Sequence, residues 1–202
     1  MSKILLIRCS INSKSKRGSI SGYALDLFKK EYIEKYPQDT IIENDLNKIN
    51  FLQVCINENN LDTWFDQNSK DLINELKSVD KLVIATSMVN FNFPSLLKNY
   101  IDKICLAGET FFYKYDNGKG GSEGLLKNLK VAFITSQGSP VQYYPFSAIP
   151  SNLEGTFRFL GSNVVKSVIL DGSKIPTEAS KTKEEFVDKF KSEISNLVNT
   201  LN

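Results

Sequence analysis

Short, nearly continuous apolar stretches recur along the chain, and polar or turn-forming residues bound each of them. Apolar runs of this length are typical of strands that are buried on both faces of a parallel sheet. The four clearest stretches are residues 3–9, 81–85, 130–135 and 164–170. A fifth stretch, residues 40–46, follows the break at Pro37 and alternates less regularly, so we expect it at an edge of the sheet.

Helical periodicity fills the segments between these predicted strands. Apolar residues at helical spacing place one face of a helix against a sheet, as Phe28 and Tyr32 do in the first such segment. The predicted helices are residues 21–36, 64–79, 95–106, 153–160 and 184–201. Strand and helix therefore alternate along the whole chain.

This alternation predicts an α/β fold, a doubly wound parallel sheet of five strands with helices on both faces. Five strands favour the flavodoxin-like order 2-1-3-4-5. Two insertions interrupt the pattern, a polar segment at residues 47–62 and a predicted hairpin at residues 109–125. No repeat or linker divides the sequence, so we expect a single domain over residues 1–202.

Ligands of open α/β sheets bind beyond the carboxyl ends of the strands. Three loops leave that edge of the predicted sheet, after Cys9, Ala85 and Thr135. We therefore expect these loops to form the functional site.

Composition restricts the chemistry of such a site. The chain has 25 Lys and Arg against 23 Asp and Glu, and the resulting charge of +2 gives no electrostatic basis for binding nucleic acid or an anionic membrane. It has no histidine, which removes imidazole acid–base chemistry and the usual zinc ligands, so we expect no metal site. Catalysis without imidazole favours a bound cofactor over catalytic side chains.

The cysteines and the amino-terminal stretch bear on the cellular compartment. Cys9, Cys55 and Cys105 are widely spaced and form no Cys-x-x-Cys pair, which fits a reducing environment. The apolar run after Met1 is too short for a signal peptide, and no stretch is long enough to cross a bilayer. We expect a cytoplasmic protein in which Cys9 and Cys105 are small core residues.

The loop after the first strand is rich in hydroxyl groups. Ser10 ends the strand, and Ser19 and Ser21 stand at the start of the first helix, where free backbone N–H groups and the helix dipole favour a phosphate. No Gly-x-Gly-x-x-Gly or Gly-Lys-Ser/Thr pattern follows the strand, so a monophosphate is favoured over a pyrophosphate. The alternative is a solvated turn in which Ser19 or Ser21 only caps the helix.

The loop after the third predicted strand has a sequence that is distinctive enough to compare with a known family. It reads Ser87-Met88-Val89-Asn90-Phe91-Asn92-Phe93-Pro94 and continues into a helix with Leu97, Lys98, Tyr100, Ile101 and Asp102. Further matching segments are Ala107-Gly108-x-Thr110-Phe111, Glu123-Gly124-Leu125, Thr135-Ser136-x-Gly138 and Phe159-Leu160-Gly161. With these segments the sequence resembles the FMN-dependent NADH:quinone oxidoreductases known as azoreductases over almost its whole length.

The resemblance implies a set of FMN-binding residues and no catalytic side chain, because the flavin carries the chemistry. The phosphate would be held by Ser10, Ser19, Ile20 and Ser21, and the ring would lie against Met88, Val89, Asn90 and Phe91 and against Ser136, Gln137, Gly138 and Ser139. It also implies a homodimer, NADH or NADPH as electron donor, and quinones as acceptors, with azo and nitro aromatics as further acceptors. Two electrons would be exchanged by a ping-pong mechanism.

The sequence departs from the family pattern at Ser87, Val89, Gln137 and Ser139, and it lacks the histidine that many relatives carry after the third loop. These departures leave two alternatives to the oxidoreductase, an electron carrier of the flavodoxin type and a redox-inactive flavin-binding protein. The aromatic stretch at residues 140–150 also has more than one interpretation. It could be a lid over the flavin, a dimer contact, or a loop folded onto its own core.

Overall fold

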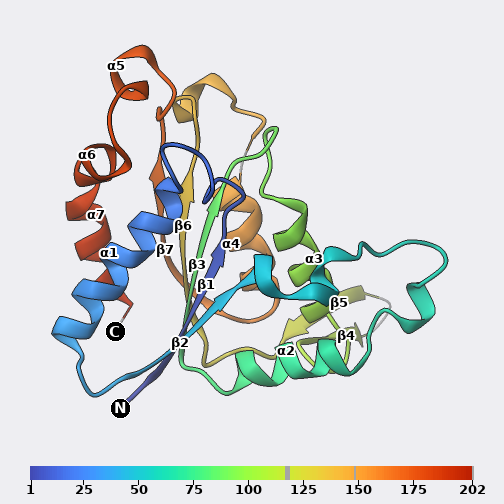
Figure 1. Cartoon of the computed structure of the whole chain (residues 1–202). Helices are drawn as coiled ribbons and strands as arrows, with labels where there is room; N and C mark the ends of the chain where they lie inside the picture. The colour runs from blue at the N-terminus through green and yellow to red at the C-terminus, as the bar shows by residue number, and fades with distance from the viewer. Residues whose placement is uncertain (117–118, 148, 202) are drawn as a thin grey trace.

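Five parallel strands form the central sheet of the computed structural model, in the order β2-β1-β3-β6-β7 (Figure 1). The structure describes residues 1–116, 119–147 and 149–201. The strands of the sheet are β1 (Lys3–Cys9), β2 (Thr40–Asp45), β3 (Lys81–Ser87), β6 (Lys130–Ser136) and β7 (Asn163–Leu170). Since β4 and β5 form a separate hairpin, this is the order 2-1-3-4-5, and the predicted fold is confirmed, with β2 at an edge.

Helices cover both faces of the sheet, as predicted, and they fall into two groups in Figure 1. On one face lie α1 (Ile20–Lys35), α6 (Lys183–Asp188) and α7 (Lys191–Thr200), preceded in the chain by the short α5 (Pro176–Ala179). On the other face lie α2 (Gln67–Lys77), α3 (Ser95–Ile104) and α4 (Ile149–Phe159). Every residue of the central strand β3 is buried, which is why residues 82–85 in its middle read as a continuous apolar run.

The prediction of one helix over residues 184–201 is wrong, because the chain turns at Lys189 and Phe190 and forms two helices. A capping box between Thr182 and Glu185 begins α6, and the amide of Phe190 donates to the carbonyl of Val187 in a tighter final turn. Phe186, Ile194 and Leu197 all face the core. Apolar periodicity therefore continues through the break and does not reveal it.

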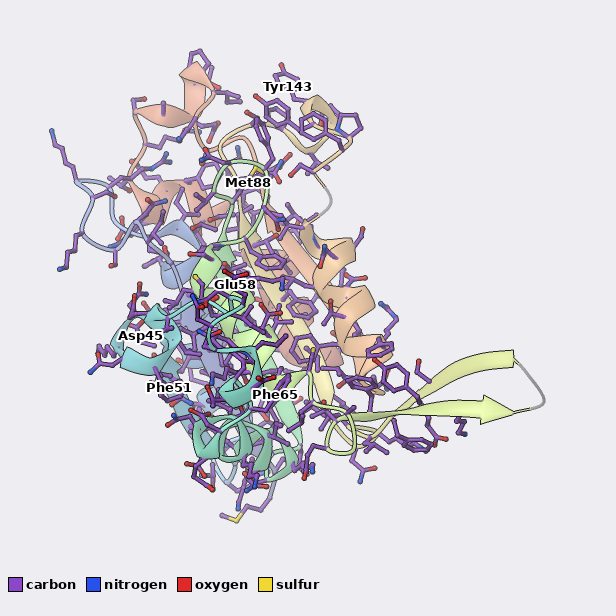
Figure 2. The ribbon with its side chains drawn as sticks, turned by 90° about the vertical axis from the view of Figure 1, so that its right-hand side faces the viewer. Asp45, Phe51, Glu58, Phe65, Met88 and Tyr143 are labelled. Atoms are coloured by element: carbon purple, nitrogen blue, oxygen red, sulfur yellow. The ribbon has the colours of Figure 1, made fainter. Side chains whose placement is uncertain are left out.

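The hairpin of β4 (Phe111–Asp116) and β5 (Lys119–Gly124) is confirmed and projects away from the sheet (Figure 2). Residues 117–118 of the predicted hairpin lie outside the described residues, as does residue 148 of the aromatic stretch. At the base of the hairpin Gly124 packs against Gly161, where a Cβ atom on Gly124 would lie 2.0 Å from the amide nitrogen of Gly161. Glycine is required there by this close approach of two backbones.

The 47–62 insertion lies beside α3 and is built of short 3₁₀ helices at Leu46–Lys48, Asn50–Gln53 and Leu61–Thr63. Trp64 follows it and is buried, with its indole N–H donating to the carbonyl of Asp102. Trp64 thus has a packing role, and Lys98 pairs with Asp102 one turn apart on α3. Within the described residues no helix is both long and apolar enough to cross a membrane.

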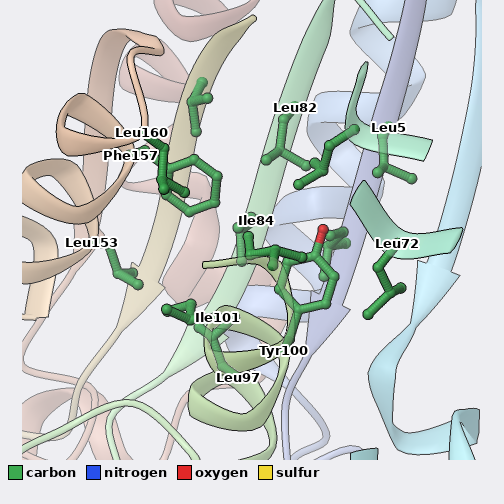
Figure 3. Close-up of a cluster of buried hydrophobic side chains, with 14 of the residues drawn as sticks. Leu5, Leu72, Leu82, Ile84, Leu97, Tyr100, Ile101, Leu153, Phe157 and Leu160 are labelled. Carbon is green, nitrogen blue, oxygen red and sulfur yellow. The ribbon is translucent and has the colours of Figure 1, made fainter. Parts of the chain in front are cut away.

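Tyr100 of α3 carries a buried hydroxyl in the core on the α2–α4 side of the sheet (Figure 3). That hydroxyl has no hydrogen-bond partner among the described residues. Because burying an unpaired polar group costs about 1–3 kcal/mol, we expect Tyr100→Phe to raise the free energy of unfolding by about 1 kcal/mol. Urea denaturation measures this change.

The control for this prediction is Tyr32→Phe, since the Tyr32 hydroxyl is also in a fully buried residue but is hydrogen-bonded to Asp39 and Lys81. Removing it is expected to lower stability. A loss of stability in Tyr100→Phe equal to that of the control would contradict the assignment of an unpaired hydroxyl.

Candidate functional site

The three loops predicted from topology meet at the carboxyl ends of β1, β3 and β6. A cavity of about 80 Å³ between them is lined by Ser10, Ile20, Met88, Ser136, Gln137 and Gly138, together with Asn12, Gly18, Ser87, Ser173 and Lys174. The amide of Met88 donates to the carbonyl of Ser136 over 2.7 Å and ties two of the loops together. Half of the predicted site residues are thus brought around one cavity.

A second cavity, of about 180 Å³, adjoins the first and shares Ser10 and Gly18 with it. It adds Ser19, Ser13 and Lys183 on the side of α1. The other predicted residues, Ser21, Val89, Asn90, Phe91 and Ser139, line neither of these two cavities.

Ser19 caps the first turn of α1. Its Oγ accepts from the amide of Gly22 over 2.8 Å and donates to Ser10 Oγ over 2.8 Å. The capping role considered from the sequence is therefore real, and it orients the hydroxyls of Ser10 and Ser19 at the helix amino terminus. The first-turn amides of Ile20 and Ser21 have no acceptor within the helix, which suits an anion.

Ser21 distinguishes this helix start from a simple solvated turn. The residue is fully buried, and its Oγ has no hydrogen-bond partner among the described residues. Ser87, which lines the first cavity, also has a buried Oγ without such a partner. Buried hydroxyls are normally satisfied, so two unpaired ones close to the converging loops are unusual and fit a site that takes a polar ligand.

The loop after β3 contains a strained turn. Val89 and Asn92 exchange backbone hydrogen bonds of 2.7 and 3.1 Å around Asn90 and Phe91, whose φ angles are 45° and 72°. Asparagine tolerates this left-handed conformation, whereas phenylalanine rarely adopts it. Strain of this kind persists only where the surroundings hold it, and it is concentrated at functional sites.

The aromatic stretch after β6 holds that turn. The Phe91 ring packs edge-on against Tyr144 and Phe146, with ring centroids 5.0 and 5.2 Å apart, and Ser147 Oγ donates to the Phe91 carbonyl over 2.6 Å. Tyr143 and Met88 lie at the same end of the molecule (Figure 2). Tyr143 and Phe146 are exposed, so these side chains are not folded into the core.

Five residues of the cavity were not among the predicted site residues. Asn12, Gly18 and Ser87 lie in the predicted loops, whereas Ser173 and Lys174 follow β7 and lie outside them. The Lys174 stem crosses Gly138, where a Cβ atom would lie 2.7 Å from Lys174 Cδ. Gln137, one of the predicted site residues, donates from Nε2 to the carbonyl of Ser139 over 2.9 Å. The rule that selected the other loops, the carboxyl end of a strand, would also have selected the loop after β7.

Two of the three cysteines, Cys9 and Cys105, are not nucleophiles. Burial raises the pKa of the Cys9 thiol to about 12 and that of Cys105 to about 11, so both are neutral thiols at neutral pH. Within residues 1–116, 119–147 and 149–201, no group of three or more candidate side chains could hold a metal ion. The arrangement is suited to binding and orienting a cofactor.

Comparison with known proteins agrees with this architecture. A family model described as having a flavodoxin-like fold matches residues 2–194. The chain is 45% identical over 195 residues to an FMN-dependent NADH:quinone oxidoreductase of Metamycoplasma arthritidis, covering 96% of each chain. It is 41% identical to a protein of the same name from Malacoplasma penetrans, covering 96% of this chain and 91% of that protein.

Among solved structures, an FMN-dependent NADH-azoreductase from Bacillus anthracis in complex with FMN superposes with a TM-score of 0.81 at 25% identity, covering the whole of both chains. Both the length of these matches and their identity exceed what a shared fold alone produces. The chain therefore belongs to the family of FMN-dependent NADH:quinone oxidoreductases, which has a flavodoxin-like fold.

Proposed function

We propose that this protein is an FMN-dependent oxidoreductase that passes two electrons from NADH to a quinone. The observation that carries the proposal is the pair of adjoining cavities where three loops of the sheet converge, with the hydroxyls of Ser10 and Ser19 at the amino terminus of α1 beside them. The relatives from Metamycoplasma arthritidis and Malacoplasma penetrans are named for FMN, NADH and quinone. FMN supplies a ring that accepts a hydride from NADH and returns two electrons to an acceptor.

Twelve residues would hold the cofactor. Ser10, Ser19, Ile20 and Ser21 would bind the phosphate through hydroxyls and first-turn amides. The turn from Met88 through Val89 and Asn90 to Phe91 would lie against the ring, and Ser136, Gln137, Gly138 and Ser139 would approach it with backbone groups. The Met88–Ser136 hydrogen bond supports this assignment because it fixes the spacing of the two ring-facing loops.

The chain's own contribution is binding and orientation. No histidine is present in the sequence, and the thiols of Cys9 and Cys105 are neutral. Phe91, Tyr144 and Phe146 would form an apolar wall beside the ring that excludes water and suits planar acceptors. Azo and nitro aromatics are proposed as further acceptors because they are also planar and would pack against the same apolar wall.

A homodimer of single-domain subunits is part of the proposal. Exposed aromatic side chains on the hairpin and the aromatic stretch, among them Tyr113 and Phe146, are candidates for a subunit contact. Both lie on segments that project from the sheet. One domain over residues 1–202 is supported by the five-stranded sheet and by the two cores that pack on its faces.

The test is a visible spectrum of the protein after mixing with FMN and desalting, followed by anaerobic NADH and then benzoquinone. We expect retained flavin absorbance, bleaching by NADH, and recovery on quinone. Retained flavin that NADH does not bleach would favour an electron carrier or a redox-inactive binding protein. Absence of retained flavin would overturn the assignment of the site.

A further inference from the structure

Arg17 lies in the loop after β1 and links it to the loop after β7 and to α5. Its Nη1 donates to the carbonyl of Ser173 over 2.7 Å and its Nη2 to the carbonyl of Glu178 over 3.1 Å. The guanidinium also lies 5.1 Å from the centre of the Phe186 ring. A planar fork that binds two carbonyls and stacks on an aromatic face is an arrangement suited to arginine and not to lysine.

The carbonyl of Ser173 is itself firmly held. The Ser173 amide and Oγ both donate to the carbonyl of Gln137, over 3.2 and 3.1 Å. Next to them, the amide of Lys174 donates to Gly138 over 2.8 Å and that of Gly172 to Ser139 over 3.2 Å. The loop after β7 is thus bonded residue by residue to the ring-facing loop after β6, and Arg17 is bonded to that pair of loops.

The segment that Arg17 fixes has mainly local bonds of its own. The amide of Ser15 donates to Asn12, the amide of Gly18 donates to Ser15, and residues 11–16 are exposed. Gly18 then turns the chain with a φ of 76° into Ser19, the cap of α1. The position of Ser19 relative to the ring-facing loop therefore depends on how residues 11–18 are tethered.

We propose that Arg17 is a positioning residue for the FMN phosphate, an inference that rests on the proposed function. Its fork holds the loop so that Ser19, Ile20 and Ser21 face the phosphate at a fixed distance from the ring-facing loop. Its two Nη atoms donate to carbonyls and the residue lines neither of the two cavities of the site, so it acts through the loop and not by touching the cofactor. Its removal weakens recognition of the phosphate and leaves recognition of the ring unchanged.

The experiment compares FMN with riboflavin, which has the same ring and no phosphate. Apoprotein is titrated with each flavin by fluorescence quenching for wild type, Arg17→Met, Arg17→Lys and Arg158→Met. The control Arg158 is paired with Glu154 on the surface of α4, so this variant removes the same charge elsewhere. We expect Arg17→Met to weaken FMN binding about tenfold, as the loss of charged hydrogen bonds implies, and riboflavin binding less than about twofold.

Arg17→Lys separates geometry from charge, because lysine keeps the charge without the fork. We expect it to weaken FMN binding nearly as much as Arg17→Met, with Arg158→Met unchanged. Full recovery in Arg17→Lys would mean that charge alone matters, and equal losses for FMN and riboflavin would mean a general structural role; either result overturns the proposal. If Arg17→Met does not fold by urea denaturation, Arg17→Lys carries the same FMN-to-riboflavin comparison.

The outcomes also separate this proposal from the proposed function. A wild-type protein that binds no FMN overturns both. A wild-type protein that binds FMN and passes electrons from NADH to quinone, with Arg17→Met binding FMN equally well, overturns the role of Arg17 alone.

Discussion

Ser21→Ala is expected to weaken FMN binding by about 10- to 100-fold without lowering the stability of the apoprotein. A hydrogen bond to a charged group contributes about 1.5–3 kcal/mol, which is the source of the expected loss of affinity. The Ser21 hydroxyl is buried and has no partner among the described residues, so its removal leaves no hydrogen bond of the apoprotein broken. Flavin fluorescence titration measures the affinity, and urea denaturation of the apoprotein measures the stability.

A matched control exists on another helix. Ser69 is also fully buried in the first turn of a helix, α2, but its Oγ donates to the carbonyl of Trp64 over 3.4 Å. Ser69→Ala is expected to lower stability slightly and to leave FMN affinity unchanged. If Ser21→Ala instead lost stability and kept its affinity, the hydroxyl would be a structural group and the phosphate site would lie elsewhere.

The sheet could be predicted from sequence because burial on both faces leaves an apolar run in the sequence. The runs end too early at two strands, however, since β3 continues to Ser87 and β6 to Ser136. These last residues are polar, and they belong to the strands because Ser87 and Ser136 pair with each other in register. The apolar pattern of one segment holds no information about its pairing with a segment that is distant in the sequence, so it does not predict where the strand ends.

The position of the candidate site could be predicted from the sequence, but the contacts that join its loops to one another could not. Topology places the three loops at one edge, and the resemblance to a family assigns residues within them. The tie from Arg17 to Ser173 spans 156 positions, and it depends on the turn after β7, which no local pattern predicts. The contact of Phe91 with Tyr144 and Phe146 likewise depends on the path of an irregular loop, whose position is set by tertiary contacts.

The turn at Phe91 shows a conflict between local preference and tertiary structure. A sequence of Val-Asn-Phe-Asn gives no glycine for the second left-handed position, and Phe91 occupies it with a φ of 72°. The ring contacts and the Ser147 hydrogen bond offset that cost. Sequence reasoning fails here because the favourable contacts come from residues more than fifty positions away, at a place where strain is expected to be functional.

Asp39→Asn is expected to lower the free energy of unfolding by about 3 kcal/mol, because it removes the carboxylate that faces a buried lysine. Lys81 Nζ lies 3.5 Å from Asp39 Oδ2, and both side chains are only 4% exposed. The Asp39 carboxylate accepts from the Ser2 amide and from the Tyr32 hydroxyl, which in turn accepts from Lys81. This network lies at the amino ends of the strands, opposite the candidate site, so FMN affinity is expected to stay unchanged.

The pH dependence and a double variant test the same network. Burial opposes ionisation of Asp39, but its hydrogen bonds from Ser2 and Tyr32 and the charge of Lys81 outweigh it and lower its pKa. Its contribution is therefore complete above the ordinary aspartate pKa of about 4 and is lost as the pH falls through the lowered value. Urea denaturation across this range should show a steeper loss for wild type than for Asp39→Asn.

Adding Lys81→Met to Asp39→Asn removes the lysine charge as well as the carboxylate. Replacing both members of a buried ion pair is often nearly neutral, so we expect the double variant to recover more than half of the stability lost in Asp39→Asn. Recovery would show that the cost of the single variant comes from the Lys81 charge that has lost the Asp39 carboxylate, and not from the loss of the hydrogen bonds to Ser2 and Tyr32. A double variant as unstable as the sum of the two single variants would assign the stability to those hydrogen bonds.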